Sequence, residues 1–269
     1  MFGAILGDII GSPYEFDQGE KTKNFPLFSE TSAFTDDTVM TIAVCDAFLS
    51  AYGKSDEEIK DALIDSMKKW GRAYPDAGYG GNFGLWLRLD DRKPYNSFGN
   101  GSAMRVSSVA WLYKSIKDVR HAARLSAEVT HNHPEGVKGA EAVASAIFLG
   151  RIGSSKAEIR EYIEKEFQYD LSRTCDEIRP GYHHVESCME TVPEAITAFL
   201  EGVNYEDVIR NAVSLGGDCD TLTAIAGSIA EGYYGVPSPL KRACYERIPA
   251  DMQAVLQRFE EAMFRVLYM

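Results

Sequence analysis

The sequence lacks long uncharged apolar runs and is poor in basic residues relative to acidic ones. No run approaches the roughly eighteen residues that a membrane-spanning helix needs, so we expect no membrane span. The 28 lysines and arginines are outnumbered by 40 aspartates and glutamates, which gives a formal net charge of −12. A surface this acidic does not attract nucleic acid or anionic lipid. We therefore expect neither nucleic acid nor a membrane as a partner.

Cysteine is also scarce, and its spacing excludes a disulfide framework. The five cysteines form no Cys-x-x-Cys pair, and an odd number cannot all be bridged. Free thiols are typical of a reducing compartment. The apolar residues 1–10 lack the basic start of a signal peptide and include Asp8. The sequence therefore predicts a cytoplasmic protein.

Sustained alternation of β-branched residues, low-complexity linkers and internal repeats are all missing. Apolar residues instead recur at helical spacing along most of the chain. Residues 71–102 and 168–190 are expected to be loops, but neither has the composition of a domain boundary. The sequence predicts an all-α fold in which residues 1–269 form a single compact multi-helix domain.

Capping motifs predict where several helices begin. Ser55 and Ser155 each precede a glutamate by three residues, which is a capping box. Thr191 and Asn204 are expected to begin two further helices. Gly202 is expected to end the first of these in the left-handed conformation.

Two of the expected helices have little charge. Residues 136–149 and 221–232 are rich in alanine, glycine and serine, so neither has a polar face for solvent. We expect both at the centre of the fold. Glycines at positions 3, 7 and 11 leave one face of an N-terminal helix bare, which lets a neighbouring helix or a ligand approach its backbone.

Two short acidic segments precede helices. Residues 35–38 are Thr-Asp-Asp-Thr, and residues 216–221 are Gly-Gly-Asp-Cys-Asp-Thr. Each fits an ordinary helix start, where threonine caps and acids offset the helix dipole. Each also offers two carboxylates and a hydroxyl, which are hard oxygen ligands for Mg²⁺ or Mn²⁺ rather than zinc. The spacing of Asp218 and Asp220 lets both point one way, so Cys219 between them is not expected to be a ligand.

The helix that follows residues 216–221 is one of the two expected at the centre. Carboxylates that enter a protein interior must be paired or bound to metal. Four converging acids therefore predict cations, and two divalent ions about 3.5–4 Å apart would neutralise them.

Five blocks of sequence carry a family resemblance when they are taken together. They are residues 7–15 (Gly-Asp-Ile-Ile-Gly-Ser-Pro-Tyr-Glu), 35–38, 99–105 (Gly-Asn-Gly-Ser-Ala-Met-Arg), 130–134 (Thr-His-Asn-His-Pro) and 216–221. Each block is a weak signal alone, but all five in this order resemble the ADP-ribosylglycohydrolase family. This family includes the dinitrogenase-reductase-activating glycohydrolase and the ADP-ribosyl-acceptor hydrolases.

The resemblance implies an all-helical fold with a central cleft that holds two Mg²⁺ ions, or Mn²⁺ in their place. In similar proteins the distal ribose of ADP-ribose binds at the metals, and water cleaves the bond at its anomeric carbon. The substrate would be an ADP-ribosylated protein or a related ADP-ribosyl compound. The residues that match the family's metal ligands are Thr35, Asp36, Asp37, Asp218, Asp220 and Thr221.

The catalytic candidates are Glu15, Asp36 and Asp37. Cleavage of a glycosidic bond builds oxocarbenium character that carboxylates stabilise, and the attacking water needs a base. Glu15 follows Pro13 in a loop after the glycine-faced helix, where it is the candidate for the additional acid or base. Without the resemblance, Glu15 would be interpreted as an exposed loop residue.

The glycine-rich block, or glycine-rich turn, consists of residues 99–102. It is the candidate for binding the diphosphate. Successive backbone N–H groups in such a turn can cradle phosphate without a basic side chain, so an acidic protein can still bind an anionic nucleotide. The alternative is an ordinary turn before a helix over Met104–Tyr113. The substrate-binding candidates are Phe98, Gly99, Asn100, Gly101, Ser102, Met104 and His131.

Four neighbouring residues have two interpretations each. His131 and His133 suggest zinc, but two histidines alone do not make a zinc site. By resemblance, His131 contacts the ribose or the phosphate, whereas His133 packs ahead of a proline. Arg105 either offsets the acidic centre or is a buried structural ion-pair partner. Phe98 either stacks on the adenine or anchors its loop.

The acceptor and the activity itself have alternatives. Some family members that act on ADP-ribosyl-arginine carry an acid just before the glycine-rich block, where this chain has Asn96, Ser97 and Phe98. The family also contains crystallin-like relatives, so the fold can serve a non-catalytic ADP-ribose-binding or structural protein. A binuclear metallohydrolase acting on another ribosyl or nucleotide conjugate is a third hypothesis. The presence of all six predicted metal ligands favours the hydrolase.

Overall fold

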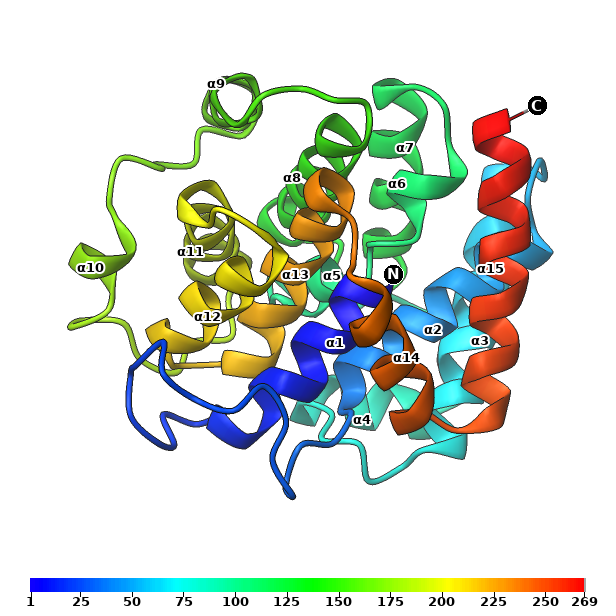
Figure 1. Cartoon of the computed structure of the whole chain (residues 1–269). Helices are drawn as coiled ribbons and strands as arrows, with labels where there is room; N and C mark the ends of the chain where they lie inside the picture. The colour runs from blue at the N-terminus through cyan, green and yellow to red at the C-terminus, as the bar shows by residue number, and fades with distance from the viewer. Residues whose placement is uncertain (269) are drawn as a thin grey trace.

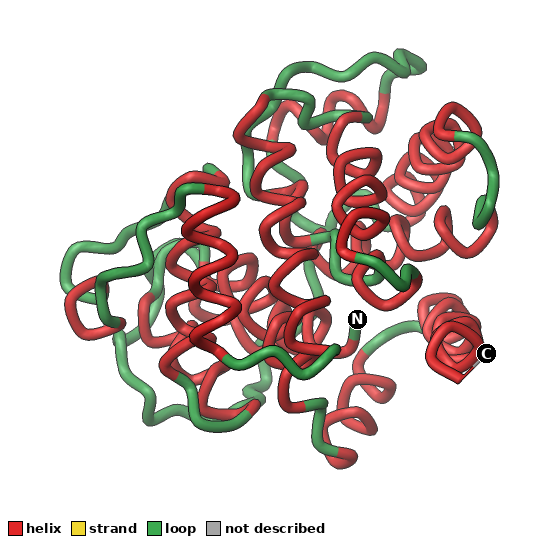
Figure 2. Tube along the Cα trace, turned by 90° about the horizontal axis from the view of Figure 1, so that it is seen from above, coloured by secondary structure: helices red, strands yellow, loops and turns green. Residues whose placement is uncertain are grey.

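The computed structural model describes residues 1–268, which form helices and loops without a strand (Figures 1 and 2). The predicted all-α fold is confirmed. The elements are α1 (Phe2–Gly11), η1 (Ser12–Tyr14), α2 (Asp36–Ser50), α3 (Asp56–Ala73), α4 (Gly81–Arg88), α5 (Gly101–Met104), α6 (Val109–Leu112), α7 (Ile116–Glu128), α8 (Pro134–Arg151), α9 (Lys156–Phe167), α10 (Cys175–Ile178), α11 (Cys188–Glu201), α12 (Tyr205–Leu215), α13 (Cys219–Tyr234), α14 (Ser238–Arg247) and α15 (Ala250–Tyr268).

Capping chemistry explains where three of these helices begin. α3 and α9 start with complete capping boxes at Ser55 and Ser155, and the side chain of Asn204 caps α12. In each case a side-chain oxygen accepts a hydrogen bond from an N–H of the first turn that has no partner within the helix. These three predictions are confirmed.

The predicted boundaries of α11 are wrong at both ends. The helix begins at Cys188, ahead of Thr191, and the N–H of Cys188 donates to the carbonyl of Phe98, which ties this helix start to the glycine-rich turn. Gly202 follows the helix in an extended conformation (φ −65°, ψ 141°) rather than a left-handed one. Its missing side chain serves packing instead, because a Cβ there would lie 2.3 Å from a methyl carbon of Val208.

Around the glycine-rich turn, the observed helices and loops also differ from the predicted ones. The predicted helix Met104–Tyr113 is wrong: the chain leaves helical geometry between α5 and α6, where the Arg105 side chain turns inward to the end of α7. Residues 71–102, predicted as a loop, contain the end of α3 and all of α4. Residues 168–190 contain the single turn of α10 and the start of α11.

The glycine-faced α1 packs directly against the backbone of α13 in the interior of the molecule (Figure 1). A Cβ added to Gly7 would lie 2.2 Å from the carbonyl oxygen of Thr223, so no side chain fits between the two helices. α13 also packs against α8 and α11. Thirteen of the 18 residues of α8 and 13 of the 16 residues of α13 are buried, which confirms the central position predicted for 136–149 and 221–232.

This packing positions the acidic segments. Buried apolar side chains from most of the helices form one continuous cluster, and α2 and α13 both contact α1 within it. The acids in the first turns of α2 and α13 therefore start from neighbouring points beside α1. None of the helices in residues 1–268 combines the length and the apolar character needed to cross a membrane.

Candidate active site

Asp8, on α1, fixes the start of α2. Its fully buried carboxylate accepts hydrogen bonds from the backbone N–H groups of Thr35 (2.9 Å) and Thr38 (3.0 Å), and from both threonine hydroxyls. The Thr35 hydroxyl also accepts a hydrogen bond from the N–H of Asp37 (3.3 Å). The capping role predicted for the first acidic segment is therefore confirmed.

The first turn of α13 meets the first turn of α2. The Thr221 hydroxyl donates to a carboxylate oxygen of Asp37 (3.0 Å). The Thr35 hydroxyl lies 3.3 Å from a carboxylate oxygen of Asp220. Hydroxyls and carboxylates from the two acidic segments thus interleave in one cluster, although 180 or so residues separate them in the sequence.

Asp218 connects this cluster to the glycine-rich turn, because its carboxylate accepts a hydrogen bond from the side chain of Asn100 (2.6 Å). Gly216 and Gly217, which precede it, have φ values of 75° and 77°, a left-handed backbone that favours glycine. Cys219 is buried, and its sulfur lies 3.8 Å from a carbonyl oxygen of α12. The two glycines therefore permit the turn that brings Asp218 into the cluster.

Burial and the crowding of carboxylates raise the pKa values of these acids. Burial, and then the charge of Asp220, raise the pKa of Asp8 to about 7 and the pKa of Glu15 to about 8. The same two causes raise the pKa values of three further acids well above the ordinary value, namely Asp36, Asp37 and Asp218. Each is disfavoured as a free anion, and positive charge among them would relieve the repulsion.

Two observations suit a metal ion. Glu15, Asp218 and Asp220 each offer a carboxylate oxygen, and these oxygens all lie within 4.8 Å of one another. The Oδ1 atom of Asp37 is buried and has no hydrogen-bond partner among the described residues. A buried carboxylate oxygen left unpaired is costly unless a cation meets it. The donors are all oxygens, which Mg²⁺ and Mn²⁺ prefer.

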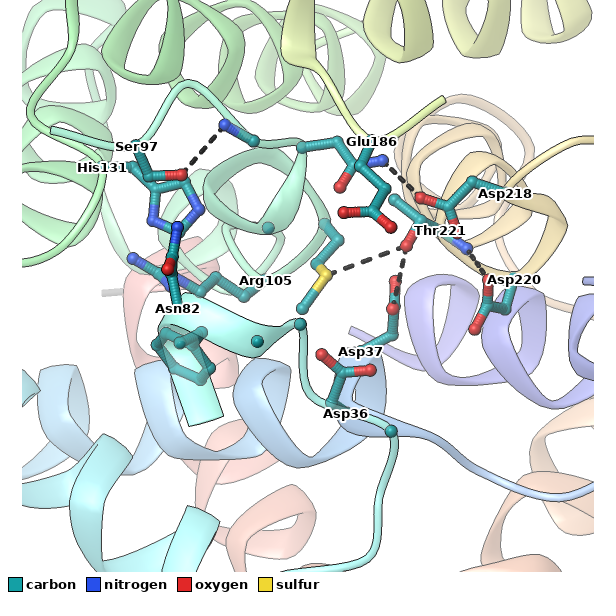
Figure 3. A pocket seen from close by; sticks show the side chains of 18 of the residues that line it. Asp36, Asp37, Asn82, Ser97, Arg105, His131, Glu186, Asp218, Asp220 and Thr221 are labelled. Atoms are coloured by element: carbon teal, nitrogen blue, oxygen red, sulfur yellow. Dashed lines mark hydrogen bonds between the residues drawn. The ribbon is translucent and has the colours of Figure 1, made fainter. Parts of the chain in front are cut away.

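A cavity of about 240 Å³ opens beside the acids. Figure 3 shows the acids on one side of it and His131 with Arg105 on the other. The side chain of Glu186 projects between these two groups. All of the predicted site residues line the cavity except Thr35, Phe98 and Ser102.

The three exceptions lie close to the cavity but outside its lining. Thr35 holds the acids from behind, through the contacts described above. Ser102 is buried, and its hydroxyl donates to the carbonyl of Gly136 (2.7 Å), so its side chain serves the packing of α5 against α8. Phe98 is about half exposed, and its ring lies 5.4 Å from that of His133 in an edge contact.

The glycine-rich turn offers fewer free N–H groups than predicted. The N–H of Gly99 donates to the Ser97 hydroxyl (3.1 Å), and the N–H of Asn100 donates to the carbonyl of Glu186 (2.8 Å). A phosphate cannot use these two donors while they are bonded within the protein. The prediction of a cradle of successive N–H groups is therefore wrong for Gly99 and Asn100, because tertiary contacts with the neighbouring loop use them first.

His131 and Arg105 form the side of the cavity away from the acids. Burial, and then the charge of Arg105, hold the pKa of His131 well below its ordinary value, so the ring is neutral at pH 7. Arg105 donates to the Ser126 carbonyl (2.8 Å) and to the Thr130 hydroxyl (2.9 Å), both of which are neutral. Its Nε is buried without a hydrogen-bond partner among residues 1–268. Arg105 is thus a buried positive charge at the cavity.

The cavity includes residues that the sequence did not identify. Asp8 supports the acids from behind the cavity, and the sequence assigned it no site role, although an acid inside an apolar helix indicates a buried partner. His184 and Glu186 line the cavity from a segment predicted as an ordinary loop, and Asn82 does so from another. No local pattern marks these three, because the packing of distant segments alone brings them here.

Comparisons with known proteins agree with this architecture. A family model described as ADP-ribosylglycohydrolase matches residues 1–266. The ADP-ribosylhydrolase ARH3 of Homo sapiens is 28% identical over 341 aligned positions, which cover 97% of this chain and 93% of that protein. The ADP-ribosylarginine hydrolase Tri1 of Pseudomonas putida is 25% identical, over 88% of this chain and 70% of that protein.

A solved structure named ADP-ribosylglycohydrolase-related protein complex has a similar fold. The TM-score is 0.73 at 22% sequence identity, and the match covers 98% of this chain and 96% of that chain. The resemblance predicted from the five sequence blocks is confirmed, because the family model spans nearly the whole chain. The chain belongs to the ADP-ribosylglycohydrolase family of enzymes.

Proposed function

We propose that this protein is a metal-dependent hydrolase that releases ADP-ribose from an acceptor by cleaving the glycosidic bond. The observation that carries the proposal is the lining of the cavity, with a buried acidic cluster on one side and a buried arginine on the other. This arrangement suits a ligand with a ribose at one end and an anionic diphosphate further along. Similar proteins that match most of the chain are named for such hydrolysis.

Two Mg²⁺ ions, or Mn²⁺ ions, are the proposed cofactors. The all-oxygen donor set, the raised pKa values and the unpaired Oδ1 of Asp37 support this assignment. When bound, such ions would supply the positive charge that neutralises the acids and polarises the ribose and a water molecule. The proposed ligands are Thr35, Asp36, Asp37, Asp218, Asp220 and Thr221.

Glu15 is the proposed general base, with Asp36 and Asp37 beside it. Burial and the charges of Asp220 and Asp8 raise the pKa of Glu15 to about 8. Cations in the cluster would offset those charges and lower this pKa toward neutrality, the range in which a base takes up and releases a proton near pH 7. The carboxylates of Asp36 and Asp37 would stabilise the positive charge that develops on the ribose.

Arg105 and His131 are the proposed partners of the rest of the ligand. Arg105 supplies a fixed positive charge with a free N–H for a phosphate oxygen. His131 is neutral and acts through hydrogen bonding. A Cβ at Gly101 would lie 3.2 Å from the Nε2 of His131, so glycine keeps that nitrogen accessible.

The acceptor is proposed to be a guanidinium group rather than a hydroxyl. Asn96, Ser97 and Phe98 carry no acid, but Glu186 supplies one from another loop. Its backbone carbonyl bonds to the glycine-rich turn, and its side chain lines the cavity with 70% exposure. Its carboxylate could therefore pair with a cationic leaving group.

We also propose a cytoplasmic protein that folds as one domain over residues 1–269. All five cysteines are buried free thiols, which supports a reducing compartment. The continuous apolar cluster supports a single folding unit.

The test is release of ADP-ribose from a panel of arginine- and serine-linked ADP-ribosyl peptides, with Mg²⁺ and after addition of EDTA. We expect release that requires Mg²⁺ and is faster for the arginine-linked peptides. Asp36→Ala and Asp218→Ala should abolish turnover, while circular dichroism shows unchanged helicity. No release from any peptide would refute the proposed function. Loss of helicity in both variants would instead assign the acids a structural role.

A further inference from the structure

The segment that follows Glu15 has an unusual backbone. Phe16 and Asp17 both have φ of 57°, in the left-handed region that residues with a side chain rarely occupy. Two such residues in succession are strained, so the surrounding structure must hold them.

Asp17 provides the contacts that hold this backbone. It is exposed, but both of its carboxylate oxygens are bonded. Oδ1 accepts a hydrogen bond from the N–H of Gly217 (2.9 Å), and Oδ2 accepts one from the N–H of His184 (2.9 Å). The N–H of Asp17 in turn lies 3.5 Å from the carbonyl oxygen of Gly217.

Two neighbours of Asp17 reinforce this attachment. The ring of Phe16 lies 4.8 Å from the ring of His184. The Nζ of Lys21 donates to the carbonyl oxygens of Arg179 (3.2 Å) and Tyr182. Phe16, Asp17 and Lys21 are called the clasp below.

The clasp connects three segments that each carry an acid of the cavity. Glu15 directly precedes Phe16, Asp218 directly follows Gly217, and Glu186 is two residues beyond His184. The one carboxylate of Asp17 therefore fixes the distances among all three segments. The carboxylate oxygens of Glu15, Asp218 and Asp220 all lie within 4.8 Å of one another, and the ionised groups repel, so Glu15 needs such a restraint to stay in the cluster.

We propose that Asp17 is a positioning residue that holds the carboxylate of Glu15 against Asp218 and Asp220. The proposal rests on the proposed function, in which Asp218 and Asp220 bind metal and Glu15 acts on the substrate beside them. Asp17 does not line the cavity, so its effect passes through Glu15. Loss of the clasp should free Glu15 to move away from the repelling acids.

Asparagine cannot replace Asp17, although it has the same shape. Both partners are N–H donors, so one of the two bonds would be replaced by two donors facing each other. Asp17→Asn is therefore the test variant. Asp170→Asn is the matched control, because Asp170 is also exposed and accepts a loop N–H, from Ser172 (2.9 Å), but lies outside the cavity lining.

The experiment is a double-mutant cycle with Glu15→Gln, measured by Mg²⁺ calorimetry and by kcat and KM for ADP-ribose release. Asp17→Asn should weaken Mg²⁺ binding and lower kcat by about 10- to 100-fold, the usual effect of losing an outer partner of a metal site, with little change in KM. The variant that carries both substitutions should be no worse than Glu15→Gln alone. Asp170→Asn should match wild type.

Additive losses in the double variant would overturn the proposal, because Asp17 would then not act through Glu15. Wild-type values for Asp17→Asn would also overturn it. If thermal unfolding shows that Asp17→Asn does not fold, Lys21→Met in the same cycle replaces it, with a smaller loss expected and the same rule of non-additivity. Mg²⁺ binding without ADP-ribose release would refute the proposed function while still testing Asp17. If the wild-type protein shows neither Mg²⁺ binding nor ADP-ribose release, both the proposed function and the proposed role of Asp17 are overturned.

Discussion

Asp8 accepts hydrogen bonds from two backbone N–H groups and two hydroxyls at the start of α2, inside an otherwise apolar helix. Asp8→Ala would remove the shared acceptor of these four donors, and the two of Thr38 are buried. We expect a loss of about 2–4 kcal/mol in the free energy of unfolding, measured by urea denaturation. Asp176→Asn is the control, since the Asp176 side chain is 89% exposed. A loss for Asp8→Ala no larger than that of the control would contradict this role.

Single residues differ in how far the sequence predicts them. The acids at 36, 37, 218 and 220 were found because each pair lies at the start of a helix, and that local pattern survives folding. Glu186 and Asn82 carry no such pattern, since distant segments bring them to the cavity. The predicted phosphate cradle is wrong at Asn100, because its N–H donates to the carbonyl of Glu186, which lies 86 residues away in the sequence.

At the scale of elements, the contact of α1 with α13 is the one that positions the acids. Gly7→Ala would place a Cβ 2.2 Å from the carbonyl oxygen of Thr223, and the two helices would have to separate. We expect a loss of about 1–3 kcal/mol or more in stability, together with weaker metal binding, because Asp8 moves with α1. The measurements are urea denaturation and Mg²⁺ calorimetry.

Gly181→Ala is the control for that substitution, because a Cβ at Gly181 would meet no atom within 4 Å. It should leave stability within about 0.5 kcal/mol of wild type. If Gly7→Ala also left stability and Mg²⁺ binding unchanged, the close approach of α1 and α13 would not be what holds the acids together.

Helix starts were predictable where the chemistry is local, as at Ser55, Ser155 and Asn204. They were not predictable where a tertiary contact decides. α11 begins early, where its first N–H bonds to the glycine-rich turn, and the predicted helix Met104–Tyr113 breaks where Arg105 turns to α7. Propensity and periodicity contain no information on such distant partners.

At the scale of the whole molecule, the raised pKa values couple stability to pH and metal. Asp8 and Glu15 have ordinary values of 3.8 and 4.5, raised to about 7 and about 8 by folding. The folded, metal-free protein therefore holds protons that the unfolded chain releases. The stability that these groups contribute is complete below about pH 4 and is lost as pH rises through about 7 to 8.

Thermal unfolding should show this coupling. We expect the Tm of the metal-free protein to fall by at least about 3 °C between about pH 6 and about pH 9. Saturating Mg²⁺ should reverse most of the fall, because cations replace the lost protons and bind only the folded state. A Tm that is flat over this range without metal, or unaffected by Mg²⁺, would contradict the account.

The central claim is that metal held by the acids of α2 and α13 creates the binding site for ADP-ribose. Calorimetric titration of ADP-ribose into the protein tests it most directly, with Mg²⁺ present, after EDTA, and after Mg²⁺ is restored. We predict binding that EDTA abolishes and Mg²⁺ restores, and no binding to Asp36→Ala under any condition. Equal binding with and without EDTA, or no binding to the wild-type protein with Mg²⁺, would contradict the claim.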